Sequence, residues 1–98
     1  IGIELVNRGR WPNWFDSNNQ NMSEPYPEAQ IAALVRLLEW LPQAVPSLRY
    51  IAGHEQLDTA LEPASDDPGR SVQRKLDPGP MFPWELVLRA IDLQQLPD

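Results

Sequence analysis

The chain has 98 residues, the size of one small domain, and is 42% hydrophobic and 22% charged, as is ordinary for a globular protein. It contains no cysteine, which excludes disulfides and thiol-ligated metals. Its net charge is −6 and its eight basic residues are scattered, which argues against a nucleic acid bound through its phosphates. No apolar run is long enough to cross a membrane, because Arg36 and Glu39 interrupt the most apolar stretch, residues 31–41.

The first predicted element is a strand over residues 1–6. Its odd-numbered residues are apolar and alternate with Gly2, Glu4 and Val6, so one face belongs on a core and the other carries a carboxylate. A strand leaves backbone groups unpaired unless a neighbouring strand pairs with it. We therefore expect sequence upstream of residue 1 to supply part of the sheet.

Residues 7–26 are predicted to form a long polar loop that carries Trp11, Trp14 and Phe15. Long loops inside small domains are often functional. The two tryptophans either stack on the apolar faces of sugar rings or pin the loop to the core, and the sequence favours neither interpretation.

Apolar residues at helical spacing predict a helix over residues 27–41, which Pro42 should end. A second strand is predicted over residues 48–54, with His54 at its carboxyl end. The segment that follows, residues 55–74, is rich in Asp, Pro and Ser and is predicted to be a second long loop. After it come a turn-dense segment over residues 75–81 and a closing helix over residues 83–92.

Four residues are candidates for chemistry: Glu4, His54, Lys75 and Asp77. Taken singly, each has a plain structural interpretation as a solvated carboxylate, a surface histidine or half of a surface ion pair. Lys75 and Asp77 are two residues apart, so they point the same way in an extended segment. Pro78 biases Asp77 towards that conformation.

His54 follows two small residues, Ala52 and Gly53, so its imidazole is open to close approach. A catalytic zinc site commonly has three histidine or carboxylate ligands and one open position. His54 and Asp77 would supply two of these ligands.

Four sequence elements follow one another in a specific order: Ile-Gly-Ile-Glu-Leu at 1–5, Tyr-Pro-x-x-Gln at 26–30, Gly-His at 53–54 and Arg-Lys-x-Asp-Pro-Gly-Pro-x-Phe-x-Trp at 74–84. In these elements the chain resembles the type 2 N-acetylmuramoyl-L-alanine amidases. These are AmpD-like zinc enzymes, related to phage T7 lysozyme and to peptidoglycan recognition proteins. The resemblance runs from residue 1 to about residue 90.

The resemblance implies an α/β fold with helices packed on a central mixed sheet, and residues 1–98 would be the C-terminal portion of a single amidase domain. It implies that His54 and Asp77 bind Zn²⁺, that Glu4 is the catalytic glutamate, and that Lys75 assists at the scissile carbonyl. The expected reaction is hydrolysis of the amide bond between N-acetylmuramic acid and L-alanine in peptidoglycan or muropeptides.

The chain departs from the family pattern in two ways. The family's first zinc histidine lies upstream of residue 1, and His54 is the only histidine here, so we expect an N-terminal segment or chain of the same protein to complete the site. The segment between His54 and Lys75 is longer than in compact family members and is similar to that of larger envelope-located homologues. This favours the periplasm or cell envelope, with cytoplasmic muropeptide recycling as the alternative.

Two other functions stay open. One is a peptidoglycan-recognition module without catalysis, although such relatives typically lose a zinc ligand and this chain keeps every expected position that falls within it. The other is a fragment without activity of its own, which is compatible with one half of a cleaved amidase.

Overall fold

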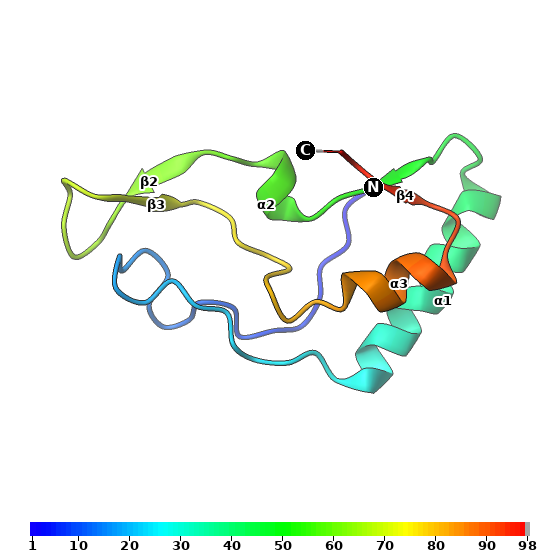
Figure 1. Ribbon diagram of the computed structural model, residues 1–98, viewed down its shortest axis with the longest axis horizontal. Helices are drawn as coiled ribbons and strands as arrows, with labels where there is room; N and C mark the ends of the chain where they lie inside the picture. The colour runs from blue at the N-terminus through cyan, green and yellow to red at the C-terminus, as the bar shows by residue number, and fades with distance from the viewer. Residues whose placement is uncertain (98) are drawn as a thin grey trace.

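The computed structural model describes residues 1–97, which form an elongated molecule of 47 × 26 × 19 Å (Figure 1). The chain contains three helices and four short strands among these residues, which confirms the predicted α/β class. In chain order they are α1 (Glu28–Ala44), β1 (Tyr50–Ile51), α2 (His54–Leu57), β2 (Leu61–Pro63), β3 (Ser71–Gln73), α3 (Trp84–Ala90) and β4 (Gln94–Gln95).

The strands form two separate two-stranded sheets and not one central sheet. β1 pairs with β4 in parallel, with Tyr50 opposite Gln94, next to the helices. β2 pairs with β3 in antiparallel register, with Glu62 opposite Val72, and this hairpin lies at the far end of the molecule (Figure 1). The prediction of a second long loop over residues 55–74 was therefore wrong in part, because Leu61–Pro63 and Ser71–Gln73 of this segment pair as strands.

Helix α1 forms because apolar residues recur at intervals of three and four along its buried face, namely Ile31, Leu34, Leu38 and Leu41. The prediction that Pro42 ends the helix was wrong by two residues. Pro42 stands in the last turn, where it removes a single backbone donor. The helical pattern continues past it, since the backbone nitrogen of Val45 donates to the Leu41 carbonyl oxygen at 2.7 Å.

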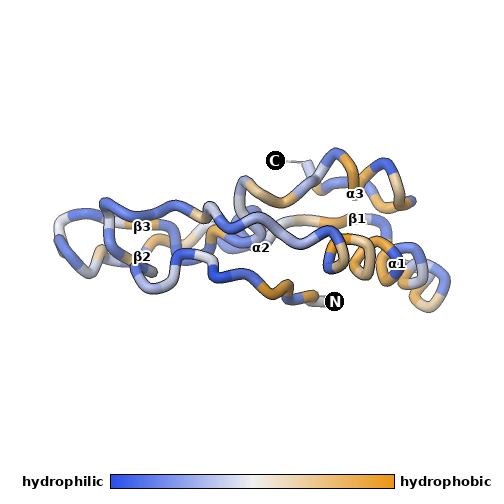
Figure 2. The backbone as a smooth tube through the Cα atoms, turned by 90° about the horizontal axis from the view of Figure 1, so that it is seen from below, coloured by the Kyte–Doolittle hydropathy of each residue, from blue (hydrophilic) through white to orange (hydrophobic). Residues whose placement is uncertain are grey.

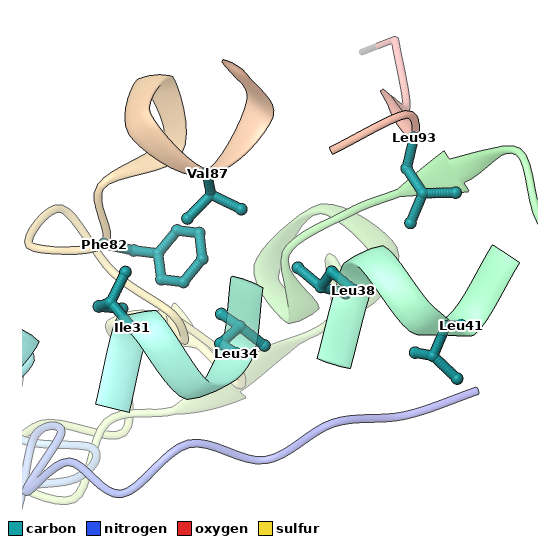
Figure 3. Close-up of a cluster of buried hydrophobic side chains, with 7 residues drawn as sticks. All are labelled: Ile31, Leu34, Leu38, Leu41, Phe82, Val87 and Leu93. Carbon is teal, nitrogen blue, oxygen red and sulfur yellow. The ribbon is translucent and has the colours of Figure 1, made fainter. Parts of the chain in front are cut away.

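The core lies between α1, α3 and the segments that flank α3. Phe82 packs between the α1 residues and Val87 of α3, which is completely buried (Figure 3). Apolar residues gather at this end of the chain, whereas the hairpin end is mainly hydrophilic (Figure 2). In residues 1–97, no helix is both long and apolar enough to cross a bilayer.

Residues 1–6 do not form the predicted strand, because no strand of the described chain pairs with them. The side chain of Gln30 pairs with the backbone of Val6 in place of a neighbouring strand. Gln30 accepts from the Val6 backbone nitrogen at 2.6 Å and donates to the Val6 carbonyl oxygen at 3.0 Å. Of the three odd-numbered apolar residues, Leu5 packs against the core, whereas Ile1 and Ile3 are exposed.

The other predicted elements are present with shorter bounds. The strand expected over residues 48–54 is limited to β1, and His54 begins α2 instead of ending the strand. The closing helix expected over residues 83–92 is α3, and it ends at Ala90 because the chain then turns extended towards β4. The strand β4 was not predicted from the sequence.

We predict that Gly79→Ala lowers the free energy of unfolding by about 1–3 kcal/mol, because Gly79 has a φ of +80° that an L side chain rarely adopts. An added Cβ would also lie 2.9 Å from the Met22 sulfur. Urea unfolding followed by tryptophan fluorescence measures the change. The matched control is Gly2→Ala, where no heavy atom lies within 4 Å of the new Cβ. Equal stability of the two variants would contradict the prediction.

Candidate active site

His54 and Asp77 lie together although 23 residues separate them in the chain. The Nδ1 atom of His54 lies 3.1 Å from Oδ2 of Asp77, and both side chains are about half exposed, at 46% and 55%. His54 is the first residue of α2, and Asp77 lies in the turn that follows β3. The structure therefore brings together the two residues that the sequence proposed as metal ligands.

A backbone contact between the two segments produces this proximity. The backbone nitrogen of Glu55 donates to the carbonyl oxygen of Asp77 at 3.1 Å. Gly53 makes the close approach possible, because a Cβ at that position would lie 2.9 Å from Cδ of Pro78. A larger residue at position 53 would push the two segments apart.

The turn that carries Asp77 is also held from the side of α1. The hydroxyl of Tyr26 donates to the Pro78 carbonyl oxygen at 2.7 Å. The tight packing of Met22 against Gly79 fixes the next residue of the turn. The position of Asp77 is thus set by neighbours on both sides of the site.

The negative charge of Asp77 acts on several neighbouring groups. Burial, and then the charge of Asp77, raises the pKa of Tyr26. The same two causes raise the pKa of Glu55, opposed by a backbone hydrogen bond and by His54. Oε2 of Glu55 is buried and has no hydrogen-bond partner within residues 1–97. Burial of this oxygen without a partner disfavours the charged form of Glu55, in agreement with the raised pKa.

The geometry of His54 and Asp77 suits zinc. Two ligand atoms at zinc-to-ligand distances of about 2.0–2.1 Å lie about 3.3–3.4 Å apart in a tetrahedral site. In the structure the two side-chain atoms form a hydrogen bond of 3.1 Å, a separation slightly shorter than that spacing. Within residues 1–97, no group of three His, Cys, Asp or Glu side chains is placed to hold a metal.

The two other predicted site residues, Glu4 and Lys75, form no bond with His54 or Asp77. Glu4 is exposed and Lys75 is half-buried, and neither forms a hydrogen bond or an ion pair within residues 1–97. Their catalytic assignment remains a prediction.

The loop over residues 8–20 lies beside the β2–β3 hairpin and is held there by polar contacts (Figure 1). The backbone nitrogen of Ser65 donates to the Phe15 carbonyl oxygen at 2.9 Å, and both the backbone nitrogen and the hydroxyl of Ser17 donate to Asp66 at 2.7 Å. An open hollow between loop and hairpin reaches Leu76.

Trp11 and Trp14 do not pin this loop to the core, since they are 56% and 50% exposed. Arg10 does the holding instead: its guanidinium is buried and donates to backbone carbonyls just before Lys75. Arg10 was not predicted from the sequence, because it belongs to no periodic apolar pattern. Glu55 was not predicted either, because its backbone contact is to Asp77, which lies far along the chain.

The chain is similar to known proteins of one family. The family model described as N-acetylmuramoyl-L-alanine amidase matches residues 1–80. The chain is 38% identical over 85 residues to the N-acetylmuramoyl-L-alanine amidase AmiD of Escherichia coli strain K12. That match covers 87% of this chain and 25% of AmiD, so the chain spans about a quarter of this relative's length.

No solved structure matches the chain. The family match covers both the Gly-His element and the segment that carries Asp77, which are the two parts that the fold brings into contact. The chain belongs to the N-acetylmuramoyl-L-alanine amidase family.

Proposed function

We propose that this chain is part of a zinc-dependent enzyme that hydrolyses the amide bond between N-acetylmuramic acid and L-alanine in peptidoglycan or muropeptides. The observation that carries the proposal is the His54–Asp77 pair, whose facing atoms lie 3.1 Å apart in a chain of the amidase family. The printed name of the AmiD relative supports the same reaction. Retention of both ligand positions favours an enzyme over a module that only recognises peptidoglycan.

His54 and Asp77 would hold the zinc ion, and a further ligand would come from sequence outside residues 1–98. This need for an N-terminal segment follows from the family resemblance, in which the first zinc histidine precedes the Ile-Gly-Ile-Glu element. When bound, the ion supplies Lewis-acid polarisation of the scissile carbonyl and makes water acidic enough to react near neutral pH.

Two residues of this chain would carry the proton and charge chemistry. Glu4 would accept a proton from the attacking water and return it to the leaving amine. Lys75 would stabilise the negative charge that develops on the carbonyl oxygen. Both side chains are unpaired within residues 1–97, so both are available to a substrate.

We also propose that the protein acts in the periplasm or cell envelope, with cytoplasmic muropeptide recycling as the alternative. Support comes from the long segment between His54 and Lys75, which is similar to that of larger envelope-located homologues. In the structure this segment contains the β2–β3 hairpin.

The first prediction of this proposal concerns zinc. His54→Ala and Asp77→Asn should each lower the zinc content of the complete protein, because each removes one ligand of the pair. Elemental analysis of the dialysed protein measures the zinc content. The control is Asp67→Asn, which changes an exposed carboxylate on the hairpin turn that pairs only with neighbours in that turn. Undiminished zinc in both site variants would refute the metal assignment.

The second prediction separates catalysis from metal binding. Glu4→Gln should leave zinc bound but slow the release of stem peptides from purified sacculi by roughly 10²–10⁴-fold, the usual contribution of a general base. The control is Glu39→Gln, which neutralises an exposed carboxylate of α1. Turnover at the parent rate in Glu4→Gln would show that Glu4 is not the base.

A further inference from the structure

Arg10 is the one buried charged side chain within residues 1–97, and only 7% of it is exposed. Nη1 donates to Oε1 of Gln20 at 2.8 Å and to the carbonyl oxygen of Gln73 at 2.7 Å, and Nη2 donates to the carbonyl oxygen of Arg74 at 2.7 Å. The guanidinium also lies over the ring of Phe15, 5.3 Å from its centroid. A single side chain thus joins the loop over residues 8–20 to the end of β3.

Stability alone does not explain this choice of residue. Every acceptor of the Arg10 guanidinium is neutral, so no direct ion pair offsets the removal of its charge from water. Burial lowers the pKa of Arg10, and the nearby charge of Asp77 opposes that effect. An apolar side chain in its place would avoid the buried charge but would leave the Gln20 side chain and the carbonyls of Gln73 and Arg74 without this donor.

The position of the two carbonyls indicates what Arg10 does. The carbonyl of Arg74 and the backbone nitrogen of Lys75 belong to one rigid peptide plane, so the hydrogen bond from Arg10 fixes the plane from which Lys75 departs. On the hairpin side, the backbone nitrogen of Arg74 donates to the Ala60 carbonyl oxygen at 2.9 Å. Residue 74 is therefore held from two sides.

Lys75 itself makes no polar contact within the described residues. It lies outside the regular elements, is half-buried, and forms no hydrogen bond or ion pair within residues 1–97. The direction of its side chain therefore depends on the backbone that precedes it. We propose that Arg10 is a positioning residue of the amidase reaction, which orients Lys75 by holding the carbonyls of Gln73 and Arg74; this inference rests on the function proposed above.

The test compares Arg10→Met, Arg10→Lys and the control Arg89→Met in the complete, zinc-saturated protein, with purified sacculi as substrate. Arg89 is an exposed residue of α3 that pairs with Glu85. Arg10→Met should lower kcat by roughly 10- to 100-fold with KM little changed, because displaced catalytic groups cost rate more than binding. Arg10→Lys should recover part of the loss, since it keeps the charge and one donor group. Arg89→Met should behave like the parent.

A double-variant comparison distinguishes positioning from plain stabilisation. If Arg10 acts through Lys75, Arg10→Met should lower kcat far less in a Lys75→Met background than in the parent. An equal fold-loss in both backgrounds would overturn the proposal and leave Arg10 a structural residue. If Arg10→Met does not fold, Gln20→Ala removes only one acceptor of the Arg10 guanidinium. Gln20→Ala must then lower kcat in the parent background and lower it far less in the Lys75→Met background.

Hydrogen exchange followed by mass spectrometry gives a readout that needs no activity. Arg10→Met should exchange the backbone amides of residues 73–77 faster than the parent, and Arg89→Met should not. Unchanged exchange and unchanged kcat in Arg10→Met would refute the positioning role while the amidase proposal stands. A parent protein that releases no stem peptides would refute the amidase proposal, whatever the exchange result.

Discussion

The site depends on one hydrogen bond, from the backbone nitrogen of Glu55 to the carbonyl oxygen of Asp77. It joins the start of α2 to the turn after β3, and neither segment belongs to a long element that could place it independently. Because the donor directly follows His54, the bond also fixes the histidine beside the aspartate. The contact requires the absence of a side chain at Gly53, so a single glycine permits the whole arrangement.

The apolar core reaches this contact through two aromatic residues. Phe82 follows Gly79 by three residues and packs between α1 and α3, so the turn that carries Asp77 is tied to the core a few residues later. The ring of Tyr26 meets Phe82 edge-on, with centroids 5.8 Å apart, while its hydroxyl donates to the Pro78 carbonyl oxygen. The side chain of Tyr26 therefore links the packed core to the turn that carries Asp77.

Sequence reasoning succeeded where a pattern is local and failed where the cause is a distant partner. The stripe of α1 predicted that helix, with an error only at Pro42, whose effect depends on its place in the last turn. Apolar residues alternate over residues 1–6 as they do in a strand. A strand also needs a second strand to pair with, and the alternating pattern does not show whether one is present. The meeting of His54 with Asp77 was predicted from the family motifs, because nothing in local spacing reveals a contact over 23 residues. Arg10 was not predicted at all, because its burial is decided by a hairpin that lies some sixty residues later in the chain.

The loop over residues 8–20 and α2 both contact the segment that leads to Asp77. Arg10 approaches the segment before Asp77 with a buried positive charge, and Glu55 approaches it with a carboxylate that lacks a hydrogen-bond partner within residues 1–97. The negative charge of Asp77 favours the protonated forms of Arg10 and Glu55. Asp77 therefore lies within electrostatic range of both side chains. The carbonyl of Arg74, which Arg10 binds, and the carbonyl of Asp77, which the Glu55 backbone nitrogen binds, lie three residues apart, so the loop over residues 8–20 and α2 together determine where Asp77 lies.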